Sequence, residues 1–220
     1  MEDRDFFEKK TPLLDVSTLS DRAYNMTIGG TITWGMILNI IMYHYFAQDI
    51  LKLHILSVIV IYLIGSFTCI HIVDVAENPV VGFLGFSGLS LSMGLLLTYC
   101  IVHYDIADIQ KAFIMTAAIT LFMTALSGIF PNFFIGLGRI LFTVLIAFIV
   151  VEIIMLFMGM APAIMDYICV GLFCLYVGYD WAVAQDSSHT PLNAIESAAK
   201  IYIDMANIFI RILSIISKKK

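Results

Sequence analysis

Two aspartates in the C-terminal part of the sequence are the residues best placed to do chemistry. Asp180 follows a long apolar run, and Asp204 lies within the next helical stretch. A third acid, Glu152, lies in the middle of another apolar run. Ionisable side chains inside membrane helices cost free energy, so they are candidates for function rather than for structure.

The spacing of Asp180 and Asp204 allows the two carboxyl groups to meet. In an antiparallel hairpin with helix ends near Ser188 and Pro191, their depths differ by about 8 Å, which is within the uncertainty of the ends. Two carboxylates in a low-dielectric site cannot both ionise cheaply, so they would share a proton and respond to pH. Their oxygens would also suit a calcium ion. The alternative is that each aspartate caps a helix or faces loop water separately.

The elements that must position these acids are membrane helices. Of the 220 residues, 60% are hydrophobic and 13% are charged, and the mean hydropathy is +0.94. A bilayer core requires about 20 apolar residues per helix. Six stretches meet this requirement: Met26–Ala47, Leu53–Val73, Val80–Val102, Ala112–Phe130, Arg139–Met158 and Ala163–Val183.

The remaining composition leaves little outside the membrane. We predict a polar N-terminal segment over residues 1–25, a membrane domain over 26–217 and a basic tail over 218–220. The N-terminal segment lacks the apolar core of a signal peptide. The net charge of −5 is spread along the chain, and no basic block with interleaved aromatics indicates nucleic-acid binding. The expected partner is the lipid bilayer.

A seventh helix is predicted from Thr190-Pro191, a cap followed by proline at the first helical position. Its polar side chains, which include Lys200, Asn207 and Arg211, fall within about 100° of arc. Two interpretations remain open for this polar face. The helix could lie flat on the membrane surface with its charges in water, or it could stand inside the bundle and line a polar cavity.

Two C-terminal motifs resemble those of the Bax-inhibitor-motif family of membrane proteins. They are the run Gly171–Asp180, which ends Tyr-Val-Gly-Tyr-Asp, and the run Ile201–Phe209, which is similar to Tyr-Leu-Asp-x-x-Asn-x-Phe. The resemblance implies an all-α fold of seven transmembrane helices, with the C-terminal helix central and wrapped by the other six. It also implies a calcium-permeable, pH-sensitive leak, with Asp180 and Asp204 at the paired-aspartate positions.

The chain departs from that family at two places. Residues 74–79, at the end of the second apolar stretch, are acidic where bacterial relatives carry basic residues. Glu152 replaces a polar amide and adds a possible third carboxylate. The short N-terminus resembles bacterial members, which implies the bacterial cytoplasmic membrane; a eukaryotic member would occupy the endoplasmic reticulum.

Intramembrane proteolysis is the enzymatic alternative, and the sequence argues against it. Gly85-Phe86-Ser87-Gly88 matches the GxSG of serine proteases, but the later histidines lie in loops, and small residues here are explained by close helix packing. The GxGD of aspartyl proteases is absent around Asp204. We therefore expect no enzyme activity.

The sequence thus predicts a pH-sensitive cation leak, with calcium as the cation, gated by Asp180 and Asp204. These two aspartates are also the predicted transient calcium ligands, and no other cofactor is expected. Accessory polar roles are predicted for Glu152, Asn207, Lys200 and Arg211. A non-conducting regulator that binds a membrane-bound protease or channel is the alternative from another class.

Overall fold

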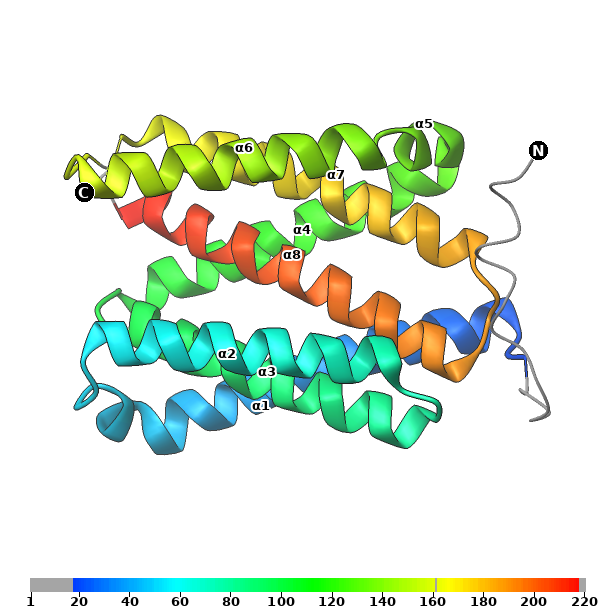
Figure 1. Cartoon of the computed structure of the whole chain (residues 1–220), viewed down its shortest axis with the longest axis horizontal. Coiled ribbons are helices and arrows are strands. Elements are labelled where there is room, and N and C mark those ends of the chain that lie inside the picture. Colours follow the sequence, from blue (N-terminus) through cyan, green and yellow to red (C-terminus); the bar gives the residue numbers. More distant parts are fainter. Residues whose placement is uncertain (1–17, 161, 218–220) are drawn as a thin grey trace.

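The computed structural model describes residues 18–160 and 162–217, and within them the chain forms eight α-helices and no strand. Residues 1–17 of the predicted N-terminal segment and the predicted basic tail 218–220 lie outside the described residues. The helices are α1 (Asp21–Ile50), α2 (Ile55–Val75), α3 (Pro79–Ile101), α4 (Ile106–Ile129), α5 (Pro131–Gly136), α6 (Gly138–Phe157), α7 (Ile164–Asp186) and α8 (Pro191–Ser217) (Figure 1).

Local signals explain where several helices begin. The Ser20 hydroxyl accepts from the backbone of Ala23 at the start of α1, and Asn78 caps α3 directly before Pro79. The predicted start of α8 is confirmed, because the Thr190 hydroxyl accepts from the Asn193 N–H at 3.1 Å and Pro191 is the first helical residue. Each cap satisfies a backbone donor that the first helical turn leaves without a partner.

Six of the described helices are long and apolar enough to cross a membrane: α1, α2, α3, α4, α6 and α7. Most of the side chains of α2 and α6 are exposed, and these are largely isoleucine, leucine, valine and phenylalanine. Such a surface is stable against lipid tails and not against water. The chain is therefore an integral membrane protein. α8 is not among the six, because it carries too many charged side chains along its length.

α8 packs against five of the other described helices. It runs from the end of the bundle where α1 begins and α7 ends to the opposite end, with α6 and α7 on one side and α2 and α3 on the other (Figure 1). It packs most extensively on α7 and also contacts α4, α1, α3 and, more weakly, α2. Buried apolar residues of α8, including Ile201, Ile208 and Leu213, join three clusters that hold these helices together.

Small residues let α2 and α3 approach closely. A Cβ atom at Gly85 would lie 3.2 Å from the backbone oxygen of Cys69, and one at Gly88 would lie 2.6 Å from the Cys69 sulfur. On α2, Gly65 faces the side chain of Ser92 in the same way. The sequence interpretation of this segment as a close-packing surface is confirmed.

The structure adds one element that the sequence reading did not contain. Residues 131–138 lie between two of the predicted apolar stretches, and there the chain forms the short helix α5, with proline in its first turn. Phe134 of α5 is 1% exposed and packs against α7. Proline at the first helical position was the available signal. A different signal follows the C-terminal end of α6, where Gly159 has a φ of +67°, a conformation that favours glycine.

A hydrogen bond within the membrane domain ties α8 to α1. The Asn39 amide nitrogen donates to the Tyr202 hydroxyl at 2.5 Å, and the Tyr202 ring packs edge-on against Phe86. We expect Tyr202→Phe to lower the free energy of unfolding by about 1–3 kcal/mol, because a donor is left without an acceptor. Thermal unfolding in detergent measures this. The exposed Tyr167 supplies the matched control, since Tyr167→Phe should leave the melting temperature unchanged; equal melting temperatures for both variants would contradict the prediction.

Candidate functional site

The structure brings Asp180 of α7 and Asp204 of α8 into contact. Their carboxyl groups lie within hydrogen-bonding reach of each other. Asp204 is 4% exposed, and its Oδ2 atom is buried without a hydrogen-bond partner. Two ionised carboxylates cannot donate to each other, and a buried acceptor without a donor is costly. A single proton held between them would supply the missing donor.

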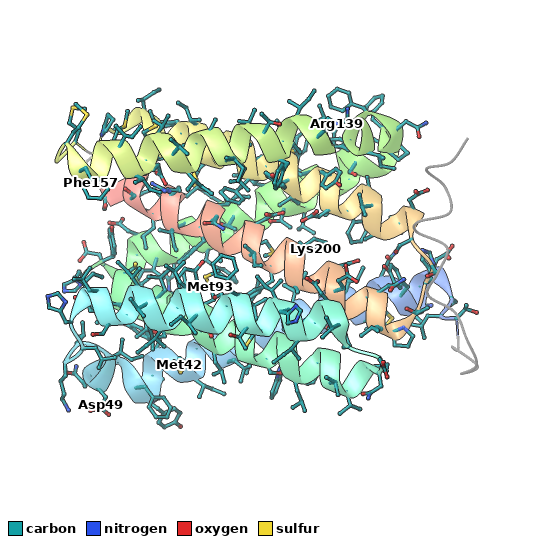
Figure 2. All side chains as sticks on the ribbon, in the orientation of Figure 1. Met42, Asp49, Met93, Arg139, Phe157 and Lys200 are labelled. Carbon is teal, nitrogen blue, oxygen red and sulfur yellow. The ribbon has the colours of Figure 1, made fainter. Side chains whose placement is uncertain are left out.

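Lys200 provides the positive charge next to this pair. It lies in the N-terminal half of α8, between the ribbons of α7 and α2 in the view of Figure 2. Its ammonium group donates to Glu196 Oε1 at 2.8 Å and also interacts electrostatically with Asp180 and with Asp74. Asp74 lies next to the last residue of α2. The acidic end of α2 therefore faces a base on α8.

Tyr176 is a neighbour of the pair that the sequence reading missed. It lies one turn before Asp180 on α7 and interacts electrostatically with both aspartates. The spacing from Asp180 could have identified Tyr176, because residues four apart on a helix lie on the same face. Asn207, a predicted accessory residue, bonds its own helix instead: its amide nitrogen donates to the backbone oxygen of Ile203 at 2.9 Å.

A second charged cluster lies further along α8. Arg211 donates through Nη2 to Glu152 Oε1 of α6 at 2.6 Å and through Nη1 to Asp166 Oδ1 of α7 at 3.0 Å. Ser214 donates to the other oxygen of Asp166 at 2.9 Å. Glu152, a predicted accessory polar residue, thus accepts a hydrogen bond from Arg211. The role of Asp166 was missed, although it lies 14 residues before Asp180 and so on nearly the same face of α7.

The residues that suggested proteolysis have other partners. The Ser87 hydroxyl donates to the backbone oxygen of Phe83 at 2.8 Å and accepts from the indole nitrogen of Trp34 at 3.1 Å. These bonds give Ser87 a local role in the packing of α3 against α1. Within the described residues, no group of three or more histidine, cysteine, aspartate or glutamate side chains is arranged to hold a metal ion.

Comparison with known proteins adds two findings. The profile of the family described as inhibitor of apoptosis-promoting Bax1 matches residues 16–220, which is nearly the whole chain. An uncharacterized protein of Helicobacter pylori is 31% identical over 137 residues, an alignment that covers 61% of this chain and 57% of the relative. No solved structure matches the chain.

Proposed function

The chain belongs to the Bax inhibitor family, and on that premise we propose that it is a pH-sensitive cation leak, with calcium as its cation, gated by the proton that Asp180 and Asp204 share. The observation that carries the proposal is the buried contact of these two carboxyl groups, with one oxygen of Asp204 lacking a donor. While the two carboxyl groups share a proton, the pathway is closed. Loss of that proton leaves two negative charges at the site.

The proposal assigns α8 as a seventh membrane crossing at the centre of the bundle. A helix of 27 residues is about 40 Å long, which is enough to span a bilayer. Its contacts with α1, α2, α3, α4 and α7 support this assignment, as does the burial of Asp204. A helix lying flat on the membrane surface would turn that carboxyl group toward water.

Charge balance provides the gating step. With one proton shared, the pair carries a single negative charge beside the ammonium group of Lys200, which Glu196 and Asp74 also share. Raising the pH removes the proton and leaves two carboxylates beside one base. Because this excess negative charge is costly in a low-dielectric site, the two carboxylates must separate or recruit a cation. The oxygens of two carboxylates suit transient binding of calcium.

Calcium efflux from liposomes tests this proposal. The purified chain, reconstituted into liposomes loaded with calcium, should release calcium faster than liposomes without protein. The rate should rise as the pH is raised from about 5 to about 8, where a shared carboxyl proton is lost. Liposomes loaded with potassium would show whether the leak discriminates between cations.

Efflux equal to that of empty liposomes at every pH would contradict the leak. That result would favour the alternative, a non-conducting regulator that binds a membrane-bound protease or channel. Co-purification of such a partner in mild detergent would then be the next measurement. The bacterial relative supports placing this chain in a bacterial cytoplasmic membrane, and cell fractionation would test that placement.

A further inference from the structure

The cluster around Arg211 is separate from the aspartate pair but lies on the same face of α8. Arg211 follows Asp204 by seven residues, which is two helical turns and about 10 Å along the axis. On α7, Asp166 and Asp180 also lie on nearly one face. The interface between α7 and α8 therefore carries two charged layers.

An apolar layer separates these two charged layers. Val177 and Phe173 lie between the two aspartates of α7, and Ile208 lies between Asp204 and Arg211 on α8. All three are buried and belong to the same core cluster. A cation that has passed the aspartate pair would next meet this apolar layer and then the Arg211 cluster.

The geometry points to Arg211 as a second barrier of the cation pathway: its guanidinium group is a tethered cation that fills an acidic site and must move aside for a cation to pass. This inference rests on the proposed leak. The guanidinium group of Arg211 links two helices, because one nitrogen donates to Glu152 of α6 and another donates to Asp166 of α7. The site holds two acids and one base, so departure of Arg211 would leave two carboxylates facing each other.

Burial strengthens this arrangement. The side chain of Asp166 is 6% exposed and that of Arg211 is 27% exposed, so water screens their attraction only in part. Both oxygens of Asp166 are engaged, one by Arg211 and one by Ser214. Cys169 of α7 also lies next to the guanidinium group. These contacts hold the positive charge in place until the guanidinium group moves aside.

The test compares calcium efflux from liposomes containing the wild-type chain and the variant Arg211→Gln. We expect efflux about tenfold faster for the variant at the pH where the wild type is slow, because a fixed positive charge no longer repels the permeating cation. Arg139→Gln is the matched control. That arginine is exposed and lies on α6, near α5 and away from α8 (Figure 2), so its removal should leave efflux unchanged.

A purely structural role for Arg211 predicts a different pattern. Glu152→Met breaks the same link between α6 and α8 but keeps the positive charge, which Asp166 still holds. We expect efflux at or below the wild-type rate for this variant. If Glu152→Met raised efflux as much as Arg211→Gln, the cluster would only fasten α6, and the inference would be wrong.

The outcomes also separate this inference from the proposed leak. No efflux from the wild type at any pH would contradict the leak itself, whereas a leaking wild type with an unchanged Arg211→Gln variant would overturn only the second barrier. If the Arg211→Gln variant does not fold, calcium efflux of the Arg211→Lys variant tests the inference instead. Lysine keeps the charge but cannot bridge both acids as a fork, so a few-fold rise in efflux is expected and unchanged efflux overturns the inference.

Discussion

Replacing either Asp180 or Asp204 with asparagine should flatten the dependence of calcium efflux on pH, in both variants alike. Asparagine keeps a hydrogen bond to the remaining carboxyl group but cannot take part in a shared titration. The wild-type chain in liposomes should show efflux that rises with pH, and the ratio of rates between about pH 8 and about pH 5 should approach one in each variant.

The sign of this effect follows from the charges that face the pair. Tyr176 of α7 lies next to both aspartates, and Lys200 of α8 lies next to Asp180. The ammonium group of Lys200 also pairs with Glu196 of α8 and interacts with Asp74 of α2. With one aspartate replaced, only one carboxylate of the pair can ionise, so the second negative charge never forms. No excess negative charge then develops at high pH, so no cation is recruited and efflux stays low.

The control is an aspartate on the same helix that takes no part in the pair. Asp186, the last residue of α7, is exposed, and Asp186→Asn should retain the wild-type pH profile. A profile that is unchanged in Asp180→Asn and Asp204→Asn would show that the pair does not gate the leak. A profile flattened in one variant only would show that the two carboxyl groups do not titrate together.

A methyl group added at Gly178 should destabilise the membrane domain by about 1–3 kcal/mol, the range for overpacking a well-packed core. A Cβ atom there would overlap the buried ring of Phe134 of α5. The neighbouring contact is equally tight, because the Ser127 hydroxyl donates to the backbone oxygen of Gly178 at 2.5 Å. The melting temperature of Gly178→Ala in detergent, compared with that of the wild type, measures the effect.

Gly171 on the same helix provides the matched control. A Cβ atom there meets nothing within 4 Å, so Gly171→Ala should be neutral or stabilising by up to about 1 kcal/mol, the helix preference of alanine over glycine. The double variant Gly178→Ala with Phe134→Leu should recover part of the loss, because the overlapping ring is gone. Equal melting temperatures for the two alanine variants would contradict the packing argument.

The membrane class and the start of α8 could be predicted because they depend on local signals. Six apolar stretches correspond to α1, α2, α3, α4, α6 and α7, since the length of a membrane helix follows from bilayer thickness. Thr190-Pro191 predicted the first turn of α8 because a cap and a proline act within one helical turn. The helix α5 was missed because six residues are too few for a periodic pattern.

Candidate residues could be found from the sequence, but most of their partners could not. The cost of burying a charge singled out Asp180, Asp204 and Glu152 one by one. The pairing of the first two was inferable because a short loop joins their helices. The bond from Arg211 to Glu152 spans 59 residues, and no local signal links α6 to α8.

The sequence alone determined that this chain is a helical membrane protein, which residues are costly to bury, and that one helix carries a polar face. These properties follow from side-chain chemistry and helical period, which act over a few residues. Only the tertiary structure decided that Lys200 lies among three acids and that Arg211 bridges two helices. Such contacts depend on how the helices cross, and crossing geometry is set by packing over the whole bundle.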